Sequence, residues 1–185
     1  MKRAVFLDRD GVINRRAREG EYITRWEEVQ LLPGVAEAIA TLVREDFAVI
    51  VVTNQRCVAK GLLTVSELES IHRRMRQELA AAGAVITDIY FCPHDYQPPC
   101  DCRKPAPGML LTAARAHEID LNGSWMIGDS DIDVEAGKSA GCRTARILDG
   151  GEIAHGGADV FAQSLLDAVQ QIVLPAFATR KTISR

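Results

Sequence analysis

Two aspartates stand directly after a short apolar run near the N-terminus. Asp8 and Asp10 follow residues 4–7, and Gly11 would let the chain turn away sharply behind them. At a strand end, one carboxylate can attack phosphorus as a nucleophile while the other donates a proton to the leaving group and later activates water. An acidic turn without chemistry explains an isolated Asp-x-Asp equally well, so the pair needs support from elsewhere in the sequence.

A second acidic group follows the apolar run at residues 125–128. Asp129 and Asp133 stand there at the start of a predicted helix. Mg²⁺ prefers carboxylates and water, and the side chains of Asp8 and Asp129 with a backbone carbonyl at Asp10 would be enough protein ligands. Asp133 is expected to support these ligands from behind, although an acid favoured by the helix dipole would also explain its place.

So many carboxylates would repel phosphate unless nearby positive groups balance their charge. Lys104, held by the following Pro105, is the best side-chain candidate. Thr53 can add a hydroxyl hydrogen bond, and backbone amides around Arg9 and Asn54 can surround the remaining oxygens. Together with magnesium, these groups would stabilise the oxygens of a transferring phosphoryl group.

Four potential ligands for a second metal crowd into one short segment. They are Cys92, His94, Cys100 and Cys102. This set can close a tetrahedral Cys₃His shell around Zn²⁺ with no open position, so we expect a structural zinc. Buried or incidental cysteines are the alternative, which the spacing disfavours. The segment delivers Lys104 directly after its last ligand, so zinc would preorganise that lysine.

The elements that must position these residues are strands alternating with helices. Near-continuous apolar runs, typical of strands buried on both faces, predict strands at residues 4–7, 47–53, 85–91, 125–128 and 142–148. Helices are predicted at residues 35–46, 64–82, 107–117, 131–140 and 163–173. This order predicts a doubly wound, Rossmann-like α/β fold with a parallel sheet and helices on both faces.

Five polar positions fall at or just after the carboxyl ends of the predicted strands. They are Asp8, Thr53, Asn54, Cys92 and Asp129. Open α/β sheets bind their ligands outside this edge. The convergence of these positions is the main argument that they form one site.

Composition and charge limit the classes of partner. A hydrophobic fraction of 47% and a charged fraction of 25% are ordinary for a soluble protein. The net charge of −3 gives no general affinity for nucleic acid or an anionic membrane. No apolar run approaches the roughly 20 residues that span a bilayer. We expect a cytoplasmic monomer without nucleic-acid or membrane partners, with one domain at residues 1–174 and a basic tail at residues 175–185.

Four motifs appear in the order shown by the haloacid dehalogenase (HAD) superfamily of phosphatases. They are Asp8-x-Asp10-Gly11, Thr53-Asn54, Lys104-Pro105 and Gly128-Asp129-x-x-x-Asp133. The chain resembles that superfamily over about residues 3–150. The resemblance implies that Asp8 is the nucleophile and Asp10 the general acid and base. It places Thr53 and Lys104 at the phosphoryl group, and Mg²⁺ on Asp8, Asp10 and Asp129.

The metal-ligand segment narrows this resemblance. With Arg103-Lys104-Pro105 after it, the segment is similar to that of the D-glycero-D-manno-heptose 1,7-bisphosphate phosphatases, and histidinol-phosphate phosphatases share it. Asn14, Thr53-Asn54-Gln55 and Ala59-x-Gly61 favour the heptose branch. The resemblance implies removal of the phosphate at carbon 7 of a small phosphorylated sugar, with the phosphate at carbon 1 retained.

The expected site is open, because no large insertion of the kind that forms a cap domain follows the first strand or separates Thr53 from Lys104. Arg103 is the best candidate for the retained phosphate, because its fork can bind phosphate bidentately. Arg56-Cys57 stands where the family usually has Ser-Gly, and Arg56 either contacts a second phosphate or is a solvated loop arginine. The candidates for substrate binding are Arg9, Asn54, Gln55, Arg56, Arg103 and Ser130, with the loop at residues 15–22.

Three functions remain in competition. The first is a heptose bisphosphate phosphatase, and the second is a phosphatase for histidinol phosphate or another small sugar phosphate. The third is a zinc-stabilised module that binds nucleic acid or a protein. The acidic balance and the complete catalytic set argue against the third.

Overall fold

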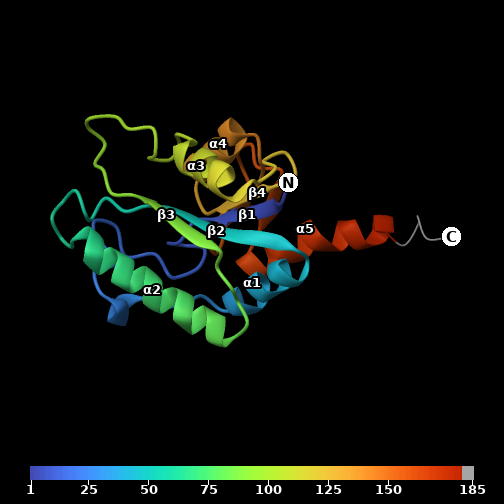
Figure 1. Cartoon of the computed structure of the whole chain (residues 1–185), viewed down its shortest axis with the longest axis horizontal. Helices are drawn as coiled ribbons and strands as arrows, with labels where there is room; N and C mark the ends of the chain where they lie inside the picture. The colour runs from blue at the N-terminus through green and yellow to red at the C-terminus, as the bar shows by residue number, and fades with distance from the viewer. Residues whose placement is uncertain (181–185) are drawn as a thin grey trace.

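Six parallel strands form one sheet in the order β3-β2-β1-β4-β5-β6 (Figure 1). The computed structural model describes residues 1–180. The strands are β1 (Arg3–Leu7), β2 (Phe47–Asn54), β3 (Asp88–Cys92), β4 (Trp125–Gly128), β5 (Arg143–Ile147) and β6 (Val160–Ala162). The chain moves outward from β1 to β3 and then returns to β4 on the other side of β1. This reversal makes the carboxyl ends of β1 and β4 the topological switch point, where such folds bind ligands.

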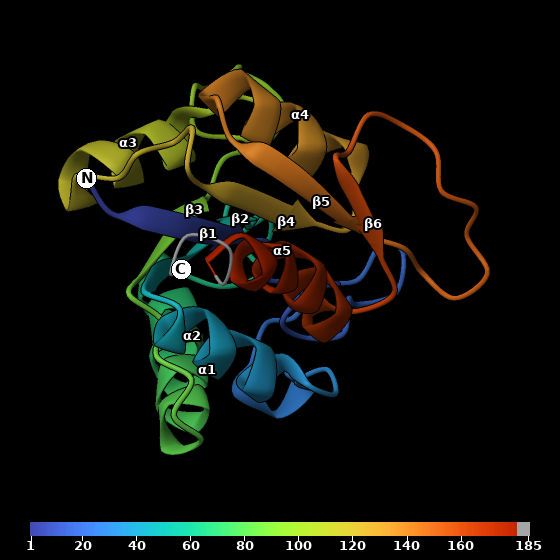
Figure 2. The same ribbon diagram turned by 90° about the vertical axis from the view of Figure 1, so that its right-hand side faces the viewer.

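Helices cover both faces of the sheet (Figure 2). They are α1 (Val35–Arg44), α2 (Val65–Ala81), α3 (Gly108–His117), α4 (Asp131–Ala140) and α5 (Leu165–Arg180), with a short 3₁₀ helix η1 (Trp26–Glu28) before α1. Helices α3 and α4 lie on one face, and α1, α2 and α5 lie on the other. The predicted doubly wound α/β fold is confirmed.

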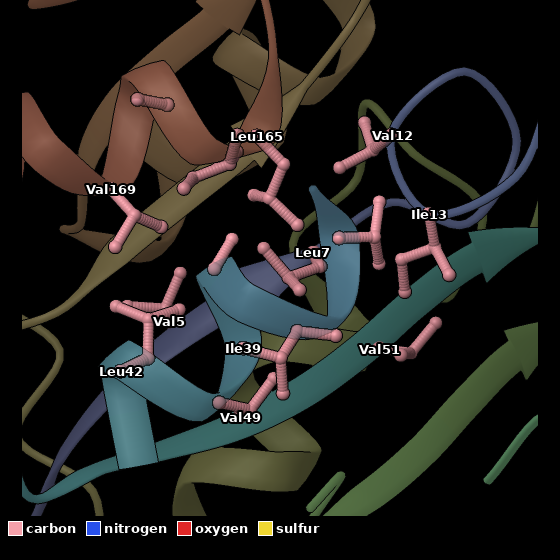
Figure 3. Packing of buried hydrophobic residues seen from close by; sticks show 14 of the residues in the cluster. Val5, Leu7, Val12, Ile13, Ile39, Leu42, Val49, Val51, Leu165 and Val169 are labelled. Carbon is pink, nitrogen blue, oxygen red and sulfur yellow. The ribbon is translucent and has the colours of Figure 1, made fainter. Parts of the chain in front are cut away.

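Alternate residues of β1 point into different cores. Val5 and Leu7 belong to the core that includes α1 and α5, and Figure 3 shows both near Ile39 of α1. Ala4 and Phe6 belong to the core formed with α3 and α4. All four side chains are fully buried, which explains why the strand is a continuous apolar run rather than an alternating pattern.

Differences between prediction and structure are local. Strand β3 begins at Asp88 rather than at residue 85, because the hydroxyl of Thr87 accepts the N–H of Val49 at 3.2 Å in place of a ladder carbonyl. Strand β6 is absent from the prediction, since three residues between loops give too short a pattern. Helix α5 extends to Arg180, into the range expected as a tail. Residues 181–185 lie outside the described chain, and the division at residue 174 stays a prediction.

No cap domain is inserted in the described residues. Between β1 and α1 the only regular element is η1, and residues 55–64 form a short connection between β2 and α2. Helix α2 starts with a capping box, in which the Thr64 N–H donates to Glu67 at 2.7 Å and the Glu67 N–H donates to Thr64 Oγ1 at 3.2 Å. Within residues 1–180, no helix has the length and apolarity needed to cross a membrane.

Candidate functional site

The sheet brings Asp8 and Asp129 to neighbouring strand ends. Leu7 of β1 pairs with Ile127 of β4, and the Asp8 N–H continues the ladder by donating to the Ile127 carbonyl at 3.0 Å. Gly11 turns the chain away with a φ of +88°, and a Cβ there would lie 1.7 Å from Asp129 Oδ2. Only glycine fits this close approach, so the Asp-x-Asp-Gly motif has a geometric reason as well as a chemical one.

Three carboxylates share this edge with one buried ammonium group. Ligand oxygens of Asp8, Asp129 and Asp133 lie within 4.8 Å of one another. Lys104 Nζ lies 2.9 Å from Asp8 Oδ1 and 2.7 Å from Asp133 Oδ1, and it donates to the Val52 carbonyl at 2.8 Å. This group, called the carboxylate cluster below, carries more negative than positive charge.

Burial, more than the neighbouring charges, shifts the pKa values of these acids. Burial raises the pKa of Asp8 to about 7, against the lowering effect of Lys104, and burial raises the pKa of Asp129 to about 6. Burial opposes the charge on Lys104, but Asp8 and Asp133 outweigh it and raise the pKa of the lysine. Hard carboxylate oxygens with surplus negative charge are what Mg²⁺ requires, so the residues present fit this ion.

Asp133 has a different environment from the other two acids. It is fully buried, and its Oδ2 accepts the Ser130 hydroxyl at 2.5 Å and the Ser130 N–H at 3.2 Å. Gly128 leaves space for it, since a Cβ there would lie 2.1 Å from Asp133 Cβ. Because its other oxygen forms an ion pair with Lys104, Asp133 fixes that lysine and the start of α4. Asp8 and Asp129 remain the better-placed ligands.

Asp10 is held by three donors. The Arg9 guanidinium grips both of its oxygens, Asn14 donates at 2.9 Å, and Gln55 donates at 3.0 Å. Burial would raise the pKa of Asp10, but the charge of Arg9 and the hydrogen bonds of Asn14 and Gln55 lower it. Gln55 also donates to Thr53 Oγ1 at 2.9 Å, which ties β2 to the loop after β1.

Among the residues predicted to bind substrate, Ser130 already donates to Asp133, and three more make their hydrogen bonds within the site. Arg9 is only 1% exposed, and its backbone N–H donates to Asp8 Oδ1 at 2.7 Å. The Asn54 amide bonds the Lys104 backbone in both directions, at 3.0 and 3.1 Å. Gln55 is buried against Asp10. These side chains orient neighbouring groups, and their roles toward a substrate stay predictions.

The other predicted contacts lie nearer the surface. Arg56 forms an ion pair with Asp95 at 2.6 Å. Arg103 donates to the His94 carbonyl at 3.1 Å, and both arginines stack on Tyr96, with 4.3 and 4.4 Å from guanidinium carbon to ring centre. Arg56 therefore connects the loop after β2 to the metal-ligand segment.

The four predicted soft ligands gather as their spacing indicates. Cys92 Sγ lies 3.6 Å from Cys100 Sγ and 3.6 Å from His94 Nδ1. Cys102 Sγ lies 3.5 Å from Cys100 Sγ and 3.2 Å from His94 Nδ1. A tetrahedral zinc with bonds of about 2.3 Å to sulfur has sulfur–sulfur edges of about 3.8 Å. The four side chains, called the zinc loop below, therefore fit Zn²⁺.

Three residues of the site were not found by sequence reasoning in the roles that they occupy. Asn14 donates to Asp10, and Arg16 forms an ion pair with Asp129 from the loop after β1. His72 lies on the buried face of α2, with its Nε2 3.2 Å from Arg9 Nη1. The available signal for His72 was its position in the apolar stripe of that helix, four residues after Leu68.

Comparisons with known proteins agree with this geometry. A HAD-hydrolase-like family profile matches residues 101–168. A D-glycero-beta-D-manno-heptose-1,7-bisphosphate 7-phosphatase of Rhodopseudomonas palustris is 39% identical over 175 residues, which cover 91% of this chain and 92% of the relative. A D-glycero-alpha-D-manno-heptose-1,7-bisphosphate 7-phosphatase of Mycobacterium bovis is 38% identical, covering 87% and 86% of the two chains.

A solved structure carries the same fold. The crystal structure of D,D-heptose 1,7-bisphosphate phosphatase from B. bronchiseptica, complexed with magnesium and phosphate, matches with a TM-score of 0.83 and 34% identity. The match covers 94% of this chain and 99% of that one. On these relationships, the chain belongs to the D-glycero-D-manno-heptose-1,7-bisphosphate 7-phosphatase family of HAD-like hydrolases.

Proposed function

We propose that this protein is a Mg²⁺-dependent phosphatase that removes the 7-phosphate of D-glycero-D-manno-heptose 1,7-bisphosphate. The observation that carries the proposal is the meeting of Asp8, Asp129 and Lys104 at the switch point between β1 and β4. The names of the relatives supply the substrate class. Magnesium would be held by the side chains of Asp8 and Asp129 with the Asp10 carbonyl, and it would neutralise charge on the phosphoryl oxygens.

In the first step, an Asp8 carboxylate oxygen attacks phosphorus and the bond between phosphorus and the sugar oxygen breaks. Asp10 donates its proton to that leaving oxygen. Because Arg9 and its neighbours lower the pKa of Asp10, the negative charge of the incoming phosphate has to raise that pKa before Asp10 can carry the proton. Lys104 stays beside Asp8 and balances the charge that gathers there.

In the second step, Asp10 takes a proton from water, and the oxygen of that water attacks phosphorus. The bond between phosphorus and Asp8 breaks, inorganic phosphate leaves, and both carboxylates return to their starting state. We expect Thr53 and the backbone amides around Arg9 and Asn54 to hold the remaining phosphoryl oxygens. The zinc loop contributes by fixing the backbone that leads to Lys104.

Recognition of the retained phosphate falls to arginines at the surface. Arg103 is the leading candidate, because Arg56 already faces the carboxylate of Asp95. A cavity of about 610 Å³ is lined by Arg15, Arg16 and Arg18 together with Glu21, Glu27 and Glu28, so its formal charges balance. Of these residues, Arg16 also forms an ion pair with Asp129 of the carboxylate cluster.

We also propose one catalytic domain over residues 1–174, a monomer and a cytoplasmic location. The zinc loop supports the location, because thiol ligands need a reducing compartment to stay reduced. Size-exclusion chromatography with light scattering would test the monomer.

The decisive experiment is a substrate panel with purified protein and Mg²⁺. We expect kcat/KM to be highest for one anomer of the heptose bisphosphate, ahead of histidinol phosphate and fructose bisphosphate. Asp8→Asn should remove turnover while retaining the fold and the zinc. Histidinol phosphate as the best substrate would support the second candidate function, and unchanged turnover in the Asp8→Asn variant would refute the mechanism.

A further inference from the structure

We propose that His72 is a positioning residue that holds the Arg9 guanidinium in the orientation in which Arg9 grips Asp10. This inference rests on the proposed role of Asp10 as general acid and base. His72 comes from α2, which otherwise contributes apolar side chains to the buried face that it presents. Its ring is 4% exposed and lies against the most buried arginine of the described chain.

The hydrogen bond fixes the chemical state of the ring. A guanidinium has donors only, so His72 Nε2, 3.2 Å from Arg9 Nη1, must accept, and the ring proton lies on Nδ1. Burial and the charge of Arg9 lower the pKa of His72 to about 3. The ring is therefore neutral at physiological pH and available as an acceptor.

The remaining nitrogens of Arg9 are directed at Asp10. Nε lies 3.1 Å from Oδ1, and Nη2 lies 3.0 Å from Oδ1 and 2.9 Å from Oδ2. Without His72, Nη1 would be a buried donor that lacks this acceptor, and the fork could turn about Asp10. Proton transfer depends on placement of the donor within a few tenths of an ångström. Such a turn would displace Asp10 and slow the transfer of its proton to the leaving oxygen.

A packing role is the competing explanation. The ring of His72 also meets Phe91 edge to face, with ring centres 5.7 Å apart. If packing were its whole contribution, replacement would change stability and leave the reaction of the folded protein intact. A positioning role predicts a different result. Replacement of His72 would slow only the reactions whose leaving group needs the proton of Asp10.

The test compares His72→Phe with His72→Gln. Phenylalanine keeps a ring but has no acceptor, whereas the glutamine amide oxygen can replace Nε2. Each variant is assayed with heptose bisphosphate, whose alkoxide leaving group needs a proton, and with p-nitrophenyl phosphate, whose phenolate leaves without one. We expect His72→Phe to lower kcat/KM about tenfold for the sugar phosphate and less than about threefold for the aryl phosphate. KM should change little, and His72→Gln should recover most of the loss.

Met75→Ala, a fully buried residue on the same helix, is the matched control. This change should lower the free energy of unfolding without changing the ratio of kcat/KM between the two substrates. If the wild type is active and Asp10→Asn is inactive, an unchanged ratio of kcat/KM between the two substrates in His72→Phe would overturn this inference. The proposed function would then still stand. Absence of sugar-phosphate turnover in the wild type would instead refute the proposed function. Should His72→Phe not fold, the ¹⁵N shifts of His72 in the wild type decide, because a proton on Nε2 excludes the bond to Arg9.

Discussion

The zinc loop and the carboxylate cluster reach their geometries in opposite ways. The four soft ligands lie between residues 92 and 102, so a single segment that begins at the end of β3 brings them together. Asp8 and Asp129 are brought together only by the pairing of β1 with β4. The loop gathers thiols and an imidazole, the ligands of a closed zinc shell, whereas the sheet gathers hard carboxylate oxygens, the ligands that Mg²⁺ prefers.

The two regions meet at Lys104. This residue follows the last zinc ligand by two positions, and its ammonium group lies between Asp8 and Asp133. The Asn54 amide holds its backbone from the end of β2. The comparison therefore predicts that damage to the cluster spares the zinc, while damage to the zinc loop reaches the cluster through one lysine.

The largest effect is expected from Lys104→Met. The change leaves Asp8 and Asp133 buried without their counter-charge, which should destabilise the fold by about 3–5 kcal/mol. Loss of the phosphoryl-stabilising charge should lower kcat/KM by about 10³-fold. Steady-state kinetics and urea denaturation measure the two effects, and metal analysis should still find zinc. Lys138→Met, at an exposed position of α4, should match the wild type. Turnover within threefold of the wild type would disprove the role of Lys104.

A smaller loss is expected from Cys102→Ser. Removal of one thiolate should release zinc and displace the backbone before Lys104, with a fall in kcat/KM of up to about 10²-fold. Metal content per chain and kinetics at saturating Mg²⁺ give the readout. Cys142→Ser is the control, because Cys142 is buried outside the zinc loop. If the Cys102 variant lost zinc but kept full activity, the two regions would be independent.

The same comparison explains what the sequence could predict. The four predicted zinc ligands are close neighbours in the chain, so their spacing alone predicts that they gather. Asp8 and Asp129 required one further step, the rule that parallel strands present their carboxyl ends at one edge. The structure shows that both sets of side chains gather, and their roles as metal ligands stay predictions. Asp8 and Asp129 could be placed because each stands at the end of a strongly apolar run.

Roles set by side-chain direction were less accessible. Arg9 stands next to Asp8 in the sequence, and nothing in that position indicates that its guanidinium turns inward to Asp10 and His72. Arg16 lies in a loop, where no periodicity indicates its partner. The hydroxyl of Thr87 is a similar case, since it accepts the N–H of Val49 from the neighbouring strand β2 at the point where β3 would otherwise extend.

His72 makes stability depend on pH. The folded chain holds its pKa near 3, against 6.5 for an ordinary histidine, so the unfolded chain binds one more proton between these values. Above pH 6.5, His72 adds nothing to the pH dependence of the unfolding free energy. As the pH falls toward 3, His72 lowers that free energy. Between pH 7 and pH 5, the unfolding free energy of the wild type should fall about 2 kcal/mol more than that of His72→Gln. Urea denaturation at the two pH values gives the comparison, and equal falls would show that the buried ring is protonated.

The smallest effect concerns Arg16, which approaches the carboxylate cluster from the solvent side. Its side chain is 59% exposed and pairs with Asp129, so the pair should contribute less than about 1 kcal/mol. Because Arg16 competes with a cation for that carboxylate, Arg16→Ala should tighten Mg²⁺ binding by up to about fivefold. Calorimetric titration of the metal measures this, with Arg18→Ala, from the same loop, as the control. The gain should shrink at 1 M salt, where charges are screened within about 3 Å. Weaker Mg²⁺ binding in the Arg16 variant would mean that the arginine supports Asp129 as a ligand. The loop would then belong to the metal site and not only to its entrance.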